Sequence, residues 1–227
     1  MCGPIFEAAL AALVLAVPAG SQERVSFETE DGGIVYADVY GEGDRGVVLA
    51  HGGRFTKESW STQAQTLARA GFRAVAIDFR GRGQSRGGPE SAGGDDGIQF
   101  DVLAAVRYLR QAGATSVSVV GASLGGWAAG QAAVDAEPGE IDRIVLLAHS
   151  AIDQPERMKG RKLFITTRDD FSGEGVLRLP RIREQYDQAP DPKELVILDG
   201  SAHAQYIFDT ELGERLMHEI LRFLSEP

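Results

Sequence analysis

The sequence predicts an α/β protein with a mostly parallel central sheet and helices on both faces. From about residue 47 to the end, short apolar runs bounded by turn residues alternate with longer amphipathic segments, a pattern typical of repeated strand–helix–strand units. Several of these apolar runs end in polar or glycine-rich clusters. Because ligands bind beyond the carboxyl ends of parallel strands, we expect these clusters to form a site at one edge of the sheet.

The chain before residue 47 predicts an antiparallel hairpin. Residues 25–29 alternate between apolar and polar types, Asp31-Gly32-Gly33 supplies a turn, and residues 34–40 form the returning strand. Further strands are expected where short runs rich in Val, Ile and Leu lie between turn residues. These runs cover residues 47–50, 73–77, 116–120, 144–148, 163–167 and 195–198.

Helices are expected between and after these strands, where apolar residues recur at helical spacing. The predicted helices cover residues 60–70, 98–112, 127–134, 174–188 and 211–224. Ser59 is the candidate N-cap of the first helix and Gly71 its end. The fourth helix is assigned despite Pro180, which is unfavourable inside a helix. Residues 86–97 are glycine-rich and acidic and predict a mobile loop.

The composition fits one α/β domain, which we expect over residues 21–227. The chain has 227 residues, 43% of them hydrophobic, enough for one sizeable core and short for two. The formal net charge is -10, and an acidic surface repels phosphate backbones, so nucleic acid is not an expected partner. The only cysteine is Cys2, which excludes a disulfide within the chain and a cysteine-based metal site.

Residues 1–20 form an apolar N-terminal segment. The run from Ile5 to Val17 is interrupted only by Glu7, and Val17-Pro18-Ala19 is similar to a signal-peptide cleavage site. We interpret the segment as a signal peptide and expect an exported protein rather than a cytoplasmic one. The alternative is an N-terminal helix packed on the domain, because no Lys or Arg precedes the apolar run. The run is too short to predict a membrane span.

One stretch carries a candidate nucleophile. The strand expected over residues 116–120 runs directly into Gly121-Ala122-Ser123-Leu124-Gly125, and a helix is expected after it. A Gly-x-Ser-x-Gly motif between strand and helix places the serine on a sharp turn with its hydroxyl exposed. The sequence therefore predicts Ser123 as a nucleophile, with an ordinary structural turn as the alternative.

A serine hydroxyl needs a base within hydrogen-bond reach, and the base needs an acid that orients it. His203 follows the last expected strand and is the predicted base. His149 also ends a strand and is the rival base. His51 precedes two glycines and is expected to hold the shape of its loop, while His218, on the last helix, is expected to be a surface or core residue.

The acid is expected on a loop between nucleophile and base. Asp169 and Asp170 both follow the strand expected over residues 163–167. The spacing common after this strand, counted from Thr167, favours Asp170 over Asp169, and Asp199 is a third candidate. The alternative for either of the first two is a solvated carboxylate in a turn.

The oxyanion that forms in acyl transfer needs preorganised donors, each worth a few kcal/mol of the barrier. One donor is expected to be the N–H of Leu124, the residue after the nucleophile. The other is expected in the loop after residues 47–50, where we favour the N–H of Gly53 over that of Arg54; the alternative is that these glycines only form a turn. The chemistry requires no cofactor and no metal, and none is predicted.

Five motifs in order resemble those of the α/β-hydrolase superfamily, over roughly residues 25–225. They are His51-Gly52-Gly53, Asp78-Phe79-Arg80-Gly81-Arg82-Gly83-Gln84-Ser85, Gly121-Ala122-Ser123-Leu124-Gly125, Arg168-Asp169-Asp170 and Gly200-Ser201-Ala202-His203. The order Ser, Asp, His along the chain is also that of the superfamily. The resemblance implies the same fold without a cap domain and scaffold roles for Asp78 and Arg80. Arg82 stands where relatives often have His.

The resemblance also narrows the expected chemistry. A serine at position 123 argues against relatives that open epoxides or remove halides through an aspartate. Only about ten residues separate Ser150 from Arg161, where many relatives insert a lid. The chain is thus similar in build to small carboxylesterases and to dienelactone-hydrolase-like members, although the latter use Cys where this chain has Ser123.

The expected function is therefore that of a serine hydrolase acting on small or short-acyl carboxylic esters through an acyl-enzyme on Ser123. Its expected partner is a small-molecule ester. Two alternatives remain open. The first is a thioesterase, amidase or peptidase that uses the same three residues. The second is a hydrolase-like protein that binds a ligand without turnover.

Overall fold

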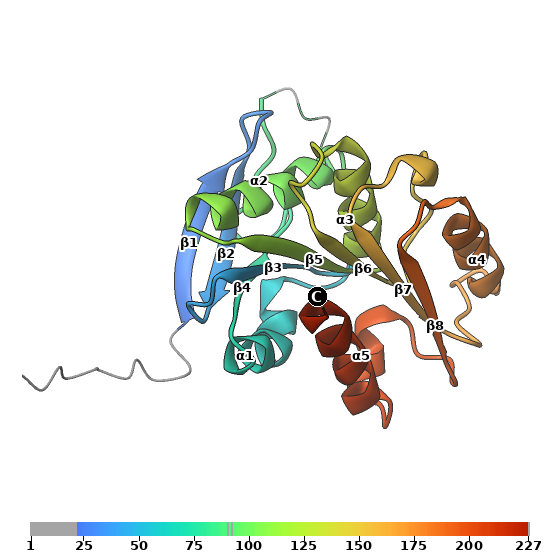
Figure 1. Cartoon of the computed structure of the whole chain (residues 1–227). Coiled ribbons are helices and arrows are strands. Elements are labelled where there is room, and N and C mark those ends of the chain that lie inside the picture. Colours follow the sequence, from blue (N-terminus) through green and yellow to red (C-terminus); the bar gives the residue numbers. More distant parts are fainter. Residues whose placement is uncertain (1–21, 90, 92, 227) are drawn as a thin grey trace, which may run out of the picture.

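A computed structural model describes residues 22–89, 91 and 93–226. The predicted signal segment, residues 1–20, lies outside the described residues. Eight strands form one sheet in the order β1-β2-β4-β3-β5-β6-β7-β8 (Figure 1). The β1–β2 and β2–β4 pairs are antiparallel, and every pair from β4 to β8 is parallel. The predicted mostly parallel sheet and its N-terminal hairpin are confirmed.

The strands agree with the predicted apolar runs, most of them with a few more residues at one end, while β1 and β6 end one residue earlier than predicted. They are β1 (Gln22–Glu28), β2 (Ile34–Tyr40), β3 (Arg45–Ala50), β4 (Phe72–Ile77), β5 (Ser116–Ala122), β6 (Arg143–Leu147), β7 (Arg161–Thr167) and β8 (Lys193–Leu198). The α-helices are α1 (Ser61–Arg69), α2 (Ile98–Gln111), α3 (Leu124–Asp135), α4 (Leu179–Gln188) and α5 (Gly213–Ser225). Three 3-10 helices are η1 (Lys57–Trp60), η2 (Pro155–Arg157) and η3 (Ala204–Asp209).

The helices cover the sheet on both faces. Figure 1 shows α2, α3 and α4 on one face and α1 and α5 on the other. The side chains of β3 alternate accordingly: Val48 packs into the core under α2 and α3, while Val47 and Leu49 pack into the core under α1 and α5. Because both faces of the parallel strands are buried, these strands are apolar throughout.

The first helix begins differently from the prediction. The 3-10 turn η1 precedes it, and α1 starts at Ser61. The hydroxyl of Ser59 donates to the carbonyl of Thr56 at 2.7 Å, so this side chain stabilises the turn and does not cap the helix. Gly71 follows the helix with φ of 84°, the left-handed conformation expected after a helix end.

The fourth helix is shorter than the predicted segment 174–188. It begins at Leu179, with Pro180 in its first turn, where the missing N–H of proline leaves no helical hydrogen bond broken. The preceding residues form a small hairpin closed by an antiparallel bridge between Phe171 and Leu177. The predicted helix over residues 174–178 is therefore wrong, because the proline is accommodated as a helix start.

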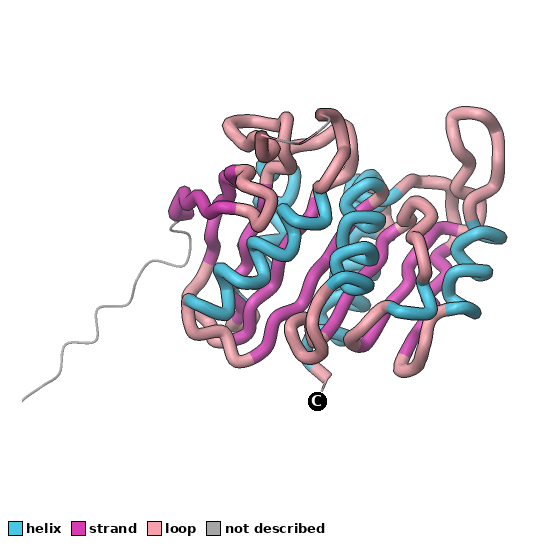
Figure 2. The backbone as a smooth tube through the Cα atoms, turned by 90° about the horizontal axis from the view of Figure 1, so that it is seen from above, coloured by secondary structure: helices cyan, strands magenta, loops and turns pink. Residues whose placement is uncertain are grey.

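The parallel strands β3 to β8 end at one edge of the molecule and begin at the other. Figure 2 shows the C-terminus near one edge, where the backbone carbonyl of Glu226 accepts from Arg143 at the start of β6. Long loops extend from the opposite edge, where the strands end. Between β6 and β7 the chain forms only the 3-10 helix η2, so no cap is inserted there. Among the described residues, no helix is both long and apolar enough to cross a membrane.

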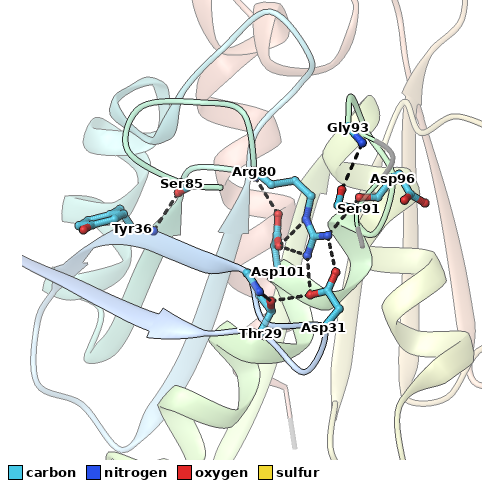
Figure 3. A network of polar contacts seen from close by, with 10 residues as sticks. Thr29, Asp31, Tyr36, Arg80, Ser85, Ser91, Gly93, Asp96 and Asp101 are labelled. Carbon is cyan, nitrogen blue, oxygen red and sulfur yellow. Dashed lines mark hydrogen bonds and ion pairs between the residues drawn. The ribbon is translucent and has the colours of Figure 1, made fainter. Parts of the chain in front are cut away.

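A largely buried charge network joins the hairpin, the loop after β4 and the start of α2. The guanidinium of Arg80 donates to Asp101 Oδ1 from Nε at 3.0 Å and from Nη2 at 2.7 Å, and to Asp31 Oδ2 from Nη1 at 2.6 Å (Figure 3). The Arg80 N–H also donates to Asp101 Oδ2. The hydrogen bond from Arg80 lowers the pKa of Asp31 to about 2. Arg80 is therefore a scaffold residue, as the resemblance implies.

Candidate active site

Ser123 lies at the turn between β5 and α3. Its φ and ψ are 53° and -112°, a region that L-residues adopt rarely and at a cost of about 1–3 kcal/mol. Its N–H donates to the carbonyl of Leu147 on β6 at 2.9 Å, and α3 begins at the next residue. The turn thus points the Ser123 side chain beyond the carboxyl ends of the strands, and the N-terminal end of α3 contributes partial positive charge beside it.

Glycines allow the close packing around this turn. A Cβ atom on Gly121 would overlap the carbonyl of Gly125, and one on Gly125 would overlap the carbonyl of Ala50. One on Gly126 would lie 2.8 Å from the Cβ of His149. The Gly-x-Ser-x-Gly pattern is therefore required by the approach of α3 to β3 and β5 at this point.

The predicted base and acid lie next to the predicted nucleophile. His203 Nε2 is 2.9 Å from Ser123 Oγ, and His203 Nδ1 is 2.7 Å from Asp170 Oδ2. A carboxylate only accepts, so Nδ1–H donates to Asp170 and Nε2 is free to accept from the Ser123 hydroxyl. The three residues follow β5, β7 and β8. In the sheet β7 and β8 are neighbours, and β6 lies between β5 and β7.

The two acid candidates have different surroundings. Asp170 is buried and faces His203, whereas the neighbouring Asp169 is exposed and contributes its backbone N–H to the carbonyl of Gly200. Asp199 is also exposed and pairs with Arg168 at 3.2 Å. Of the three, Asp170 alone has a hydrogen bond to His203 in the described structure.

The other histidines do not contact Ser123. His149, the rival base, is buried and its Nε2 is 3.1 Å from Gln185 Oε1; burial lowers the pKa of His149 to about 4. His218 is an exposed residue of α5. His51 Nδ1 donates to the carbonyl of Gly52 at 2.8 Å and its Nε2 accepts from the N–H of Phe79 at 3.3 Å. His51 therefore holds the shape of its loop, as predicted, and burial lowers its pKa, which keeps the ring neutral.

Two backbone N–H groups, those of Gly53 and Leu124, belong to residues that line one cavity together with Ser123. Leu124 is the first residue of α3, so its N–H has no acceptor within the helix, and the position of a Cβ on Gly53 would be 3.4 Å from Leu124 Cδ2. Among the described residues, neither N–H has a hydrogen-bond acceptor. Two donors without acceptors beside a serine hydroxyl are suited to bind a developing negative charge.

The loop that carries Gly53 is held by three side chains. Gly52 N–H donates to Gln205 Oε1 at 2.7 Å, the Gly52 carbonyl accepts from His51, and the Gly53 carbonyl accepts from Arg82 Nη2 at 2.8 Å. Arg82 stands where relatives often have His, and in this structure its guanidinium donates to the Gly53 carbonyl. Further along, Asp78 accepts from both the N–H and the Nζ of Lys57.

A cavity of about 460 Å³ opens at Ser123 and His203, within the size range of small-molecule sites. Its walls include the aromatic residues Phe55, Phe171 and Tyr206. Phe171 and Tyr206 are 54% and 44% exposed, so apolar surface lies at the cavity mouth where a substrate can cover it.

Charged side chains also line this cavity. They are Arg54, Asp95 and Arg178. Arg178 Nε is 3.3 Å from Asp170 Oδ1, an ion pair that lacks the alignment of a hydrogen bond. The sequence analysis did not single out Arg178, because it placed this residue inside a predicted helix. It also did not single out Gln205, whose partner Gly52 is 153 positions away. Within the described ranges, no group of three or more His, Cys, Asp or Glu side chains is arranged to hold a metal ion.

A mostly parallel sheet of this order, with a serine on a strained strand-to-helix turn at its carboxyl edge, defines an α/β-hydrolase fold. A sequence model described as "Alpha/beta hydrolase family" matches residues 47–220. The chain belongs to that family, as the motifs indicated.

Solved structures with a similar fold include several esterases. One from Pyrococcus furiosus is 19% identical, with a TM-score of 0.75 over 91% of this chain and 92% of that one. One from Rhodococcus sp. is 17% identical, with a TM-score of 0.71 over 89% and 98%, and one from Exiguobacterium antarcticum is 14% identical, with a TM-score of 0.71 over 88% and 99%. At these identities the likeness establishes the fold.

Proposed function

We propose that this protein is a serine hydrolase that cleaves carboxylic esters through an acyl-enzyme on Ser123. The observation that carries the proposal is the continuous hydrogen-bonded series Ser123–His203–Asp170, with distances of 2.9 and 2.7 Å. A serine becomes nucleophilic when a neutral imidazole accepts its proton and a carboxylate orients that imidazole. The family membership and the esterases of similar fold support the same reaction class.

In the proposed reaction, Ser123 Oγ attacks the ester carbonyl carbon while His203 Nε2 takes the hydroxyl proton. The carbonyl oxygen becomes an oxyanion and is bound by the N–H groups of Gly53 and Leu124. As the tetrahedral intermediate collapses, the C–O bond to the alcohol breaks and His203 returns the proton to that oxygen. Water then attacks the acyl-enzyme by the same steps, which releases the acid and restores Ser123.

The cavity supports a preference for small or short-acyl esters. No cap covers the site between β6 and β7, and the cavity volume is about 460 Å³, which leaves an open site with room for a small substrate. Long acyl chains would extend from such a site into water and lose the benefit of apolar burial. We therefore propose that activity declines as the acyl chain lengthens.

The experiment that tests the proposal compares Ser123→Ala with Ser118→Ala, a serine in the first half of β5. Wild type and Ser118→Ala are expected to hydrolyse 4-nitrophenyl acetate and to react with a fluorophosphonate at one serine. Ser123→Ala is expected to lose both, with a circular dichroism spectrum like that of wild type. Retained turnover or labelling in Ser123→Ala would overturn the assignment of the nucleophile.

The same assay separates the alternative functions. Matched ester, thioester and anilide substrates with one acyl group rank the reaction classes by kcat/KM. We expect the ester to have the highest kcat/KM of the three. A wild-type protein that binds ligands but does not react with the fluorophosphonate would instead be a binding module.

A further inference from the structure

The buried amide of Gln205 joins the segment that carries the base to the loop that carries Gly53. Gln205 is 6% exposed and lies two positions after His203, in the 3-10 helix η3. Its Oε1 accepts from Gly52 N–H at 2.7 Å, and its Nε2 donates to Ser59 Oγ at 2.8 Å. Both partners lie in the segment between β3 and α1, so one side chain spans two loops that are far apart in the sequence.

The direction of each hydrogen bond follows from the partners. A backbone N–H only donates, so the Gln205 atom that faces Gly52 is the amide oxygen. The Ser59 hydroxyl donates to the carbonyl of Thr56, so it must accept from Gln205. The series therefore runs in one direction from Gln205 Nε2 through Ser59 to Thr56, and both ends of the amide are satisfied.

The contacts around Gly52 set the orientation of the Gly53 N–H. The carbonyl of Gly52 and the N–H of Gly53 belong to one planar trans peptide and point in opposite directions. The carbonyl accepts from His51 Nδ1 and from the N–H of Phe55 at 2.8 and 2.9 Å, so the Gly53 N–H points to the other side. Gln205 holds the preceding peptide through Gly52 N–H, and without it that buried donor would lack an acceptor.

We propose that Gln205 is a positioning residue for the oxyanion-binding loop. It holds Gly52, and through it the Gly53 N–H, in a constant relation to the turn that carries His203. This inference rests on the proposed function, because it concerns the geometry in which an oxyanion on the substrate is stabilised. A donor displaced by a fraction of an ångström binds the transition state less well, whereas binding of the neutral substrate depends on the cavity walls.

The chain offers a matched control in Gln185. This glutamine is 7% exposed and its amide also joins two segments, accepting from Ile152 N–H at 2.8 Å and donating to the Ile152 carbonyl at 2.9 Å. It contacts His149 and not the loop of Gly53. Replacement of either glutamine by methionine keeps the length of the side chain, removes both polar atoms and leaves buried groups without partners.

The test compares Gln205→Met with Gln185→Met, with rates expressed per serine titrated by a fluorophosphonate. We expect kcat of Gln205→Met on 4-nitrophenyl acetate to fall about 10- to 100-fold with KM within about twofold of wild type. The inhibition constant of a trifluoromethyl ketone, whose adduct with Ser123 carries an oxyanion, is expected to rise by a similar factor. Gln185→Met is expected to unfold at lower urea concentration but to keep wild-type kcat per titrated site.

Each outcome decides the inference. Wild-type kcat in Gln205→Met, a change in KM alone, or an equal fall in kcat for Gln185→Met would overturn it. If Gln205→Met yields no titratable protein, Ser59→Ala decides instead: a severalfold fall in kcat at unchanged KM supports the inference, and wild-type kcat overturns it. A wild-type protein that does not react with the fluorophosphonate refutes the proposed function, and the inference falls with it. A wild-type protein that reacts, together with an unaffected Gln205→Met, refutes the inference alone.

Discussion

The exchange of Asp170 for asparagine tests the proposed triad and also decides between the two acids that the sequence left open. Asp170 is fully buried and its Oδ2 accepts from His203 Nδ1 at 2.7 Å. Asparagine has the same shape, so the cavity and the fold are expected to stay unchanged. The variant loses the negative charge beside the imidazole, and it can present an N–H group to Nδ1. The proton of the ring then moves to Nε2, which can no longer accept from Ser123.

The size of the effect follows from the geometry. A carboxylate and an imidazolium whose charges lie about 4 Å apart attract one another by about 4 kcal/mol at an effective dielectric constant of about 20. At about 1.4 kcal/mol per tenfold change in rate, loss of that attraction in the transition state costs about three orders of magnitude. The wrong tautomer increases the loss, and Arg178, 3.3 Å from Asp170 in wild type, keeps its positive charge. We therefore expect kcat to fall by about 10³- to 10⁴-fold.

The assay measures kcat and KM on 4-nitrophenyl acetate for wild type, Asp170→Asn and Asp169→Asn. The side chain of Asp169 is exposed, and its backbone contact to Gly200 does not depend on the carboxylate. Asp169→Asn is therefore expected to stay within about twofold of wild type. A thousandfold loss in Asp169→Asn, or a wild-type rate in Asp170→Asn, would show that the reasoning from the hydrogen bond is wrong.

Three further predictions concern stability and assembly of the site. Burial lowers the pKa of His149 from 6.5 to about 4, so between these pH values the unfolded state binds a proton that the folded state does not. The free energy of unfolding in urea should therefore have its full value above about pH 6.5 and fall by about 3 kcal/mol toward pH 4. His149→Phe should remove this part of the pH dependence. Arg80→Met should lower the free energy of unfolding by about 3–5 kcal/mol, because it leaves the fully buried Asp101 without its counter-ion. The double variant with Asp101→Leu should recover part of that loss, since the backbone N–H of residue 80 then lacks its acceptor. Gly125→Ala should sharply reduce the fraction of protein that a fluorophosphonate titrates, since the new Cβ overlaps the carbonyl of Ala50; full titration would contradict the argument from close packing.

Residues whose role depends on their own strand or turn could be predicted from the sequence. The alternation of apolar runs and amphipathic segments is local, so it located every strand and most of each helix. Ser123 could be found for the same reason, because its strand, turn and helix are contiguous in the chain. The closeness of His203 and the Asp169–Asp170 pair to Ser123 was predictable because parallel strands end at one edge, which brings loops together without any knowledge of side-chain packing. The choice of Asp170 over Asp169 needed the spacing from Thr167 as well.

Residues whose role depends on a distant partner could not be predicted. Gln205 and Gly52 are 153 positions apart, and a glutamine in a loop carries no periodic or motif signal. For Asp101 the sequence offers a weak signal: an acidic residue among apolar residues of a helix indicates a buried partner. In the structure Asp101 lies in the first turn of α2 and is fully buried. The start of α4 was missed because Pro180 was weighed as a helix breaker and not as a first-turn residue.

The strained turn at Ser123 is stable because other loops hold the groups around it. A φ of 53° at a serine costs about 1–3 kcal/mol, and an isolated loop would relax. Here Ser123 N–H bonds to Leu147 on β6, and the facing loop is held by Gln205 and Arg82. Each of these contacts comes from a different strand end, so no single loop can relax without breaking a hydrogen bond made by another. The rigidity that the proposed oxyanion site needs therefore depends on the strand-end contacts taken together. If the proposed function is right, a variant in any one of these contacts is expected to lower kcat while the fold is retained.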